Sequence, residues 1–237
     1  MKTAFIAGAT GYTGREVVRQ LAGSGDRVIA HVRPDSGQRE AWQRRFTDMG
    51  AEVDFTPWQV EAMAATLAEL QPALVFALLG TTRTRGKAAA RAGRDAATES
   101  YEAVDHDLTV LLLGAAEACE SAPRFLYLSS MGAGENAAGA YLKIRSRVEA
   151  RLRQSELPWT IARPSFISGP DRDEDRAGER LGASVTDAAL GFLAMVGAGG
   201  LKRRYASHGN ADLAAGLIRC GKAASWCRRV AEAADLR

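Results

Sequence analysis

The amino-acid sequence predicts an α/β protein with a doubly wound parallel sheet and a small, mainly helical C-terminal appendage. Short apolar runs alternate with stretches of helical periodicity over the first 165 residues. The run Ala73–Leu79 is continuously apolar over the length of a strand, as expected for a parallel strand buried on both faces. The chain has 237 residues, a length that suits one such domain. Right-handed crossovers then place helices on both faces of the sheet.

The first two strands and their helices follow from the local pattern. The apolar run Ala4–Ala7 ends at a glycine and predicts the first strand, and the apolar residues of Tyr12–Ala22 have helical spacing. Arg27–Val32 predicts the second strand. The polar segment Gln38–Met49 has helical composition, so it is expected to be the second helix.

The middle of the chain repeats this alternation. Ala51–Phe55 predicts the third strand, and Val60–Leu70 has the periodicity of a helix. The buried strand over residues 73–79 comes next. A long helix is expected over Ala96–Ala122, and the fifth strand over Arg124–Ser129.

The last predicted pair is a helix over Ala140–Ser155 and a strand over Trp159–Arg163. Beyond residue 164 the alternation stops, and Gly169–Arg180 is expected to be a mixed-charge loop. Helical patterns return at Val185–Val196 and Ala211–Ala231. We therefore expect a single domain over residues 1–237, in which residues 165–237 form a lid on the substrate side.

Composition and charge exclude several classes of protein. The net charge of +3 is too small to indicate a nucleic-acid partner. The apolar runs are too short to span a bilayer, and glycines interrupt the first one too early for a signal peptide. Three cysteines and three histidines are scattered without ligand spacing. We expect a reduced, cytoplasmic protein, monomeric or homodimeric, without a metal site.

A glycine-rich loop lies between the first strand and the first helix and is the main candidate binding site. Its sequence is Gly8-Ala9-Thr10-Gly11-Tyr12-Thr13-Gly14-Arg15. A dinucleotide pyrophosphate must lie against backbone N–H groups at a helix N-terminus, where side chains would obstruct it. Gly8 permits a tight turn, Gly11 allows the phosphates to approach, and Gly14 allows the helix to pack on the strand. The alternative is that these glycines only shape a turn. Their position between the first strand and the first helix favours the binding site instead.

The end of the second strand bears on the choice of dinucleotide. An acidic residue there would bind the adenosine 2′-hydroxyl, but the sequence reads His31-Val32-Arg33. Arg33 offers a planar fork to a 2′-phosphate, and Arg15 is a second candidate. The sequence therefore favours NADP(H) over NAD(H), with ordinary surface arginines as the alternative.

Five further motifs follow the loop along the chain. They are Val53-Asp54-Phe55, Leu79-Gly80-Thr81-Thr82, Leu128-Ser129-Ser130-Met131, Tyr141-Leu142-Lys143-Ile144-Arg145 and Arg163-Pro164-Ser165. With the glycine spacing, this series resembles the short-chain dehydrogenase/reductase superfamily, in its extended and atypical branches, over residues 3–170. The resemblance implies a Rossmann-type NAD(P)-binding domain. It implies that the Asp54-Phe55 pair contacts adenine, that Leu79-Gly80-Thr81-Thr82 lines the ribose, and that Arg163-Pro164-Ser165 meets the nicotinamide.

The same resemblance implies a catalytic centre. In this family a tyrosine gives its proton to a carbonyl oxygen as hydride arrives from the nicotinamide. Tyr141 is the implied acid and base, Ser130 the residue that holds the substrate oxygen, and Ser129 its substitute. A free phenol has a pKa near about 10, so a neighbouring cation must tune it.

Arg145 departs from the family pattern. The family has a lysine four residues after the tyrosine, about 40° around a helix and on the same face. Here that position is Arg145, while Lys143 lies about 200° around and faces away. Arginine supplies a positive charge and hydrogen bonds to a ribose, but it cannot release a proton. This substitution is compatible with an enzymatic activity that is lowered, changed or lost.

The sequence thus predicts an NADPH-dependent oxidoreductase acting on a small carbonyl or quinone-like substrate. The main alternative is a redox-sensing regulator that binds NADP(H) without turnover and acts through a protein partner. An isomerase or epimerase is a third possibility, disfavoured by the short C-terminal region. Asp105-His106-Asp107 is expected to be an exposed or interfacial polar face, with a supporting role beside the substrate as the alternative.

Overall fold

A computed structural model describes residues 1–81, 90, 91, 93, 95–165, 167, 168 and 208–237. Its centre is a seven-stranded sheet in the order β3-β2-β1-β4-β5-β6-β9, in which every pairing is parallel. The strands are β1 (Thr3–Ala7), β2 (Arg27–His31), β3 (Glu52–Asp54), β4 (Leu74–Ala77), β5 (Arg124–Leu128), β6 (Trp159–Arg163) and β9 (Arg229–Glu232). The strand order reverses between β1 and β4, the place where ligands bind in sheets of this type. The predicted Rossmann-type fold is confirmed.

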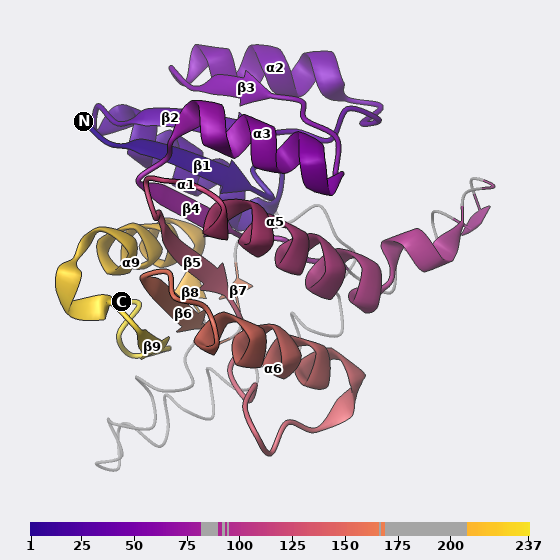
Figure 1. The fold of residues 1–237 in the computed structure, drawn as a ribbon, viewed down its shortest axis with the longest axis vertical. Coiled ribbons are helices and arrows are strands. Elements are labelled where there is room, and N and C mark those ends of the chain that lie inside the picture. Colours follow the sequence, from indigo (N-terminus) through magenta and orange to yellow (C-terminus); the bar gives the residue numbers. More distant parts are fainter. Residues whose placement is uncertain (82–89, 92, 94, 166, 169–207) are drawn as a thin grey trace.

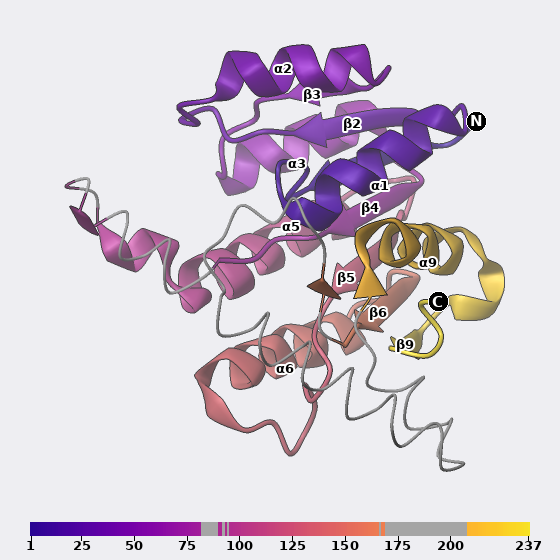
Figure 2. The ribbon, with the colours of Figure 1, turned by 180° about the vertical axis from the view of Figure 1, so that it is seen from behind.

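Helices cover both faces of the sheet. They are α1 (Tyr12–Gly23), α2 (Arg39–Asp48), α3 (Val60–Leu70), α5 (Leu108–Glu117), α6 (Gly139–Arg153) and α9 (Asn210–Lys222). Figure 1 shows α3, α5 and α6 in front of the sheet, and Figure 2, from behind, shows α1 and α9 on the other face. Within the described residues, no helix is long and apolar enough to cross a membrane.

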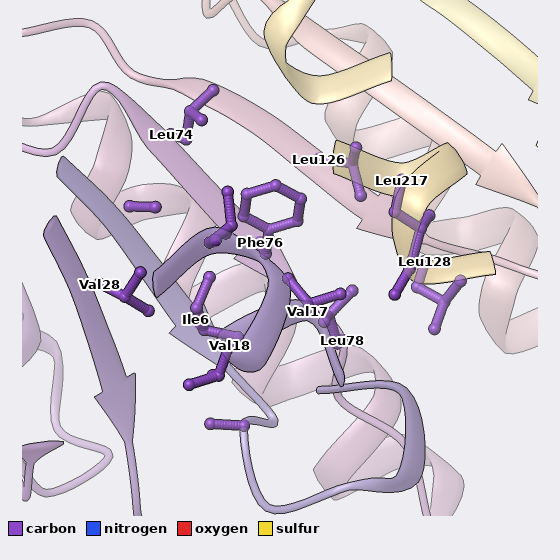
Figure 3. Packing of buried hydrophobic residues seen from close by; sticks show 14 of the residues in the cluster. Ile6, Val17, Val18, Val28, Leu74, Phe76, Leu78, Leu126, Leu128 and Leu217 are labelled. Atoms are coloured by element: carbon purple, nitrogen blue, oxygen red, sulfur yellow. The ribbon is translucent and has the colours of Figure 1, made fainter. Parts of the chain in front are cut away.

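The core divides into two apolar layers because successive strand side chains point to opposite faces. Ile6 of β1 packs with Val17 and Val18 of α1, whereas the neighbouring Phe5 packs on the opposite side. Figure 3 shows the first layer, where strand side chains meet those of α1 and Leu217 of α9. Each such buried side chain contributes roughly 1.5–3 kcal/mol. These layers hold the carboxyl ends of the strands in register.

The long helix predicted over Ala96–Ala122 is divided into three pieces. A 3-10 turn, η1, spans Ala96–Glu99, a π-helix, η2, spans Tyr101–Asp107, and α5 ends at Glu117. Ser100 has extended backbone between the first two pieces, and its hydroxyl accepts a hydrogen bond from the N–H of Ala103. A serine cap of this kind starts a new helix and so ends the previous one.

The predicted helix over Ala211–Ala231 is wrong in its second half. Helix α9 ends at Lys222, the 3-10 turn η3 spans Ala224–Trp226, and β9 then adds a seventh strand beside β6. Arg228 has a φ of 55°, which no helix continues through. Two further short strands, β7 (Ile167–Ser168) and β8 (His208–Gly209), pair with each other.

Part of the C-terminal prediction is not addressed by the structure. The predicted helix Val185–Val196 and the loop Gly169–Arg180 lie outside the described residues. Within the described part, the C-terminal segment adds strand β9 to the sheet. Its helix α9 packs on α1 and so covers the same face of the sheet.

Candidate functional site

The glycine loop forms a close-fitting turn at the carboxyl end of β1. Gly8 has a φ of 83°, and a Cβ atom there would lie 2.5 Å from the carbonyl oxygen of Leu78. A Cβ atom on Gly14 would overlap the carbonyl oxygen of Gly8. Gly11 is the N-cap of α1, whose first turn has no side-chain cap and no acidic residue. Helix N-termini of this kind bind anions, so the loop fits a pyrophosphate.

The C-terminal part of the chain supports this loop. The Asn210 side-chain amide, at the start of α9, donates a 3.0 Å hydrogen bond to the carbonyl oxygen of Tyr12. Thr13 is buried, while Thr10 and Tyr12 are half-buried. The Arg15 guanidinium carbon lies 5.9 Å from the ring centre of Trp42. The sequence did not indicate the role of Asn210, because nothing local connects it to residues almost two hundred positions earlier.

The predicted 2′-phosphate ligand, Arg33, has acidic neighbours. Its Nη1 donates a 3.0 Å hydrogen bond to Glu99, which is buried, and its Nε lies 3.7 Å from Asp35. On the same side of the site, Asp54 accepts hydrogen bonds from the N–H and hydroxyl of Thr56. Any phosphate bound by Arg33 must therefore compete with Glu99.

One face of α6 carries the predicted acid and two further polar residues. Tyr141, Arg145 and Glu149 are spaced four residues apart, which places them on one side of the helix. The half-buried Tyr141 ring lies 5.2 Å from that of Tyr101, and the Arg145 guanidinium carbon lies 5.1 Å from its centre. The described residues engage the Tyr141 hydroxyl in no hydrogen bond, so it can act on a ligand.

Arg145 is buried and joins the carboxyl ends of two strands. Its Nη1 donates to the Tyr127 hydroxyl at 3.1 Å and to the Leu128 carbonyl at 2.9 Å, and its Nη2 donates to the Leu79 carbonyl at 3.2 Å. A Cβ atom on Gly80 would lie 3.0 Å from Nη2, so glycine leaves room for the guanidinium. Burial raises the pKa of Tyr127 to about 12, so this phenol stays protonated.

Asp105 is the ion-pair partner of Arg145, and its expected place on an exposed face is wrong. The carboxylate is 0% exposed, with Oδ1 2.6 Å from Arg145 Nη2 and Oδ2 accepting a 2.9 Å bond from Thr81 N–H. Burial raises the pKa of Asp105, while Arg145 and the Thr81 N–H oppose that rise. Periodicity could not reveal this, because the neighbouring Asp107 is exposed and pairs with the half-buried His106, as a polar surface segment would.

Three buried polar atoms in this cluster lack hydrogen-bond partners among the described residues. They are Thr81 Oγ1, Asp105 Oδ1 and Arg145 Nε. The Asp105 oxygen is close enough for an ion pair with Arg145 but lacks the alignment of a hydrogen bond. Unpartnered buried polar groups are rare and costly, and they gather where β4 ends, beside the predicted ribose position. The cluster fits the polar groups of a dinucleotide. Thr82 lies outside the described residues.

The two candidate serines have different surroundings. Ser129 is buried and its hydroxyl donates a 2.7 Å hydrogen bond to Glu149. Ser130 is half-buried, and among the described residues its hydroxyl makes one long contact, 3.4 Å, with the Met131 carbonyl. Ser130 therefore has the hydroxyl better able to meet a substrate oxygen.

The sixth-strand motif is held by contacts within the protein. The hydroxyl of Ser165 donates to His208 Nδ1 at 2.9 Å, and His208 Nε2 donates to the Ala233 carbonyl at 2.9 Å. Burial lowers the pKa of His208, which keeps the imidazole neutral for this arrangement. Pro164 uses its carbonyl oxygen to accept a bond from Met131 N–H at 3.0 Å.

Arg163 is engaged by a buried carboxylate. Its Nε and Nη2 donate to Glu149 at 2.9 and 2.6 Å, and its Nη1 donates to Glu232 of β9 at 3.1 Å. Glu149 is 0% exposed. Burial alone would raise its pKa, but the bonds from Arg163 and Ser129 outweigh burial and lower the pKa.

The Glu149 cluster should make the fold acid-sensitive. Because the pKa of Glu149 is lower in the folded than in the unfolded state, its stabilisation is present above the unfolded value. That stabilisation is lost as pH falls through the folded value. Glu149→Gln should lower the free energy of unfolding at neutral pH by about 3–5 kcal/mol and flatten its decline in acid. Urea unfolding at several pH values measures both effects.

A matched control is Glu156→Gln, an exposed glutamate 3.4 Å from Arg228. This substitution should change the free energy of unfolding by less than about 0.5 kcal/mol. Equal losses in the two variants would contradict the assigned importance of the Glu149 cluster.

Comparisons with known proteins agree with this architecture. The sequence profile of a family described as NAD(P)H-binding matches residues 8–189. Protein HTATIP2 of Rattus norvegicus is 28% identical over 185 residues, which cover 76% of this chain and 68% of that protein. An anaerobillin reductase from Escherichia coli O157:H7 aligns with a TM-score of 0.62 at 13% identity, over 97% of this chain and 95% of that one. A UDP-N-acetylglucosamine 4-epimerase from Bacillus cereus gives 0.63 at 14% identity, over 97% and 76%. At these identities the two solved structures support the fold alone.

Proposed function

Because this chain belongs to the NAD(P)H-binding family, we propose that it is an NADP(H)-dependent oxidoreductase of the short-chain dehydrogenase/reductase type. Its substrate is a small carbonyl or quinone-like compound, and Tyr141 is the acid and base. One observation carries the proposal: the open N-terminus of α1 and the available hydroxyl of Tyr141 belong to the same carboxyl edge of the sheet. A bound dinucleotide can therefore place its reactive end beside an acid.

The chain offers contacts for each part of the dinucleotide. The loop from Gly8 to Gly14 holds the pyrophosphate, Asp54 and Phe55 lie at the adenine side, and Arg33 meets the 2′-phosphate. Toward the nicotinamide, the candidates are Gly80, Thr81, Arg145 and Pro164, since the side chains of Arg163 and Ser165 are held by Glu149 and His208. When bound, the nicotinamide supplies the hydride for a carbonyl carbon.

The protein supplies the proton. The Tyr141 O–H bond breaks as its proton passes to the carbonyl oxygen, and the phenolate left behind regains a proton from water. The Ser130 hydroxyl donates a hydrogen bond to the same oxygen and holds it in place. General acid catalysis of this kind contributes about 10²–10⁴-fold in rate.

The test has a binding arm and a turnover arm. Purified protein should change the fluorescence of NADPH on binding. It should also oxidise NADPH when offered a panel of aldehydes, ketones and quinones. Binding without oxidation of NADPH by any member of the panel would overturn the oxidoreductase proposal, and absence of binding would overturn the cofactor assignment as well.

A regulator that binds NADP(H) without turnover is the second candidate, and one observation favours it. Arg145 stands where the family has lysine, and its guanidinium is engaged by Asp105, Tyr127 and two backbone carbonyls. Under this alternative, binding of NADPH would alter the affinity for a protein partner, and the substrate panel would leave NADPH unoxidised.

The choice of dinucleotide can be tested at Arg33. A charged hydrogen bond is worth about 1.5–3 kcal/mol, so Arg33→Ala should weaken NADPH binding about 10- to 100-fold and leave NADH binding nearly unchanged. Fluorescence titration measures both dissociation constants. Arg44→Ala, at an exposed arginine of α2, is the control and should change neither. Equal losses for NADPH and NADH would remove Arg33 from the 2′-phosphate site.

A further inference from the structure

We infer that Asp105 is a positioning residue that fixes Arg145 and offsets the positive charge that Arg145 presents to Tyr141. This inference rests on the proposed function, because it concerns the acid of that reaction. It concerns a residue that neither the glycine loop nor the tyrosine motif includes.

The geometry makes Asp105 and Arg145 a single unit. The two charged groups are 2.6 Å apart, and both are at least nine-tenths buried. Thr81 N–H fixes the second carboxylate oxygen, so the carboxylate cannot turn away from the guanidinium. Three hydrogen bonds to Tyr127, Leu128 and Leu79 fix the guanidinium in turn.

The local helix type brings Asp105 and Tyr141 into one cluster. Asp105 belongs to the π-helix η2, and π-helical turns are rare and frequent at functional sites. Tyr101, at the start of the same π-helix, packs its ring on that of Tyr141. The segment that supplies the counter-ion of Arg145 is therefore also the segment that positions the ring of the acid.

Among the described residues, three elements contribute the charged and titratable groups around Tyr141. Its own helix contributes Arg145, η2 contributes Asp105 and Tyr101, and β5 contributes Tyr127. A single cation about 5 Å from a phenol favours the phenolate by about 1–2 pH units. A carboxylate in contact with that cation cancels most of this effect. When Asp105 is ionised, its negative charge therefore offsets that of Arg145 beside Tyr141.

The charge beside Tyr141 affects which form of the side chain is favoured. Carbonyl reduction needs the phenol, which donates its proton to the carbonyl oxygen, whereas alcohol oxidation needs the phenolate, which removes a proton from the alcohol. A lone lysine or arginine would favour the phenolate. The Asp105 carboxylate opposes that preference, so its loss should move the balance toward the phenolate.

The test is Asp105→Asn, which keeps the shape of the side chain and an oxygen for the Thr81 N–H. We expect the tyrosinate absorbance due to Tyr141 in the cofactor-free protein to appear about 1–2 pH units lower than in the wild type. Subtracting the titration of the matching Tyr141→Phe protein isolates this residue from the other four tyrosines. The alkaline limit of NADPH-dependent reduction should move by the same amount.

Two controls separate charge from structural damage. Asp107→Asn removes an exposed carboxylate from the same π-helix, paired with His106, and should leave both pH profiles unchanged. Asp105→Glu retains the charge and should retain the wild-type profiles. If Asp105→Asn does not fold, the double variant Asp105→Asn with Arg145→Lys, whose smaller cation is easier to hydrate, should show the same downward shift.

Failure of this inference is distinct from failure of the proposed function. The tyrosinate titration needs no cofactor or substrate, so a shift without turnover would support the role of Asp105 and contradict the oxidoreductase proposal. Turnover in a folded Asp105→Asn protein with both pH midpoints unmoved would overturn the inference alone. A shift of equal size in Asp107→Asn would also overturn it.

Discussion

Replacing Tyr141 with phenylalanine is expected to lower the turnover of NADPH by about 10²–10⁴-fold while changing the dissociation constant of NADPH by less than about threefold. The reason is that phenylalanine removes the proton donor but keeps the ring. The contacts of that ring with Tyr101 and with the Arg145 guanidinium need no hydroxyl. Steady-state kinetics with the best substrate of the panel and fluorescence titration of NADPH measure the two quantities.

Tyr101→Phe is the matched control for this prediction. Tyr101 is also half-buried, and its ring lies 5.2 Å from that of Tyr141. We expect this variant to retain turnover within about tenfold, because its hydroxyl has no assigned role in the reaction. If Tyr101→Phe lost activity and Tyr141→Phe kept it, the acid would be Tyr101. If both kept it, neither Tyr101 nor Tyr141 would be the acid.

The second large effect is expected at Gly14. The added Cβ of Gly14→Ala would overlap the Gly8 carbonyl oxygen and lie 2.9 Å from Ala9 Cα, so the loop or the helix must move. Overpacking of this kind costs about 1–3 kcal/mol. We expect NADPH binding to weaken about 10- to 100-fold and the melting temperature to fall by several degrees. Fluorescence titration and thermal unfolding measure these changes.

The same helix provides the control. Gly23 is the last residue of α1, and nothing lies within 4 Å of a Cβ atom built there. Gly23→Ala should leave NADPH binding unchanged and the stability equal or slightly higher, since alanine favours the helix. Wild-type affinity in Gly14→Ala would contradict the assignment of the pyrophosphate to this loop.

The sequence predicted the architecture well where apolar residues recur at the regular spacing of a strand or a helix. Alternation along the strands and four-residue spacing along the helices identified β1 to β6 with small errors at their ends. It failed at the segment after η1, where the Ser100 cap interrupts an otherwise helical composition. It also failed at β9, because the residues of Arg229–Glu232 other than Val230 favour helices and continue the composition of α9.

The candidate site likewise contains residues that the sequence identified and residues that it did not. Gly14 was identified from the glycine spacing, and Tyr141 and Arg145 from the family resemblance and from the four-residue spacing that places both on one stripe of α6. Glu149, on the same stripe, was not identified. The partners of that stripe were not identified either, since Asp105 is 40 positions from Arg145 along the chain.

By itself, therefore, the sequence determined the parallel α/β sheet, the glycine turn that opens it and the order of residues along α6. Only the tertiary structure decided which charges are neutralised: Arg145 by Asp105, Arg163 by Glu149, and Arg33 by Glu99. The physical reason is that backbone conformation responds to neighbours within a few residues. The pairing of buried charges depends instead on which side chains the crossovers bring to the same edge of the sheet.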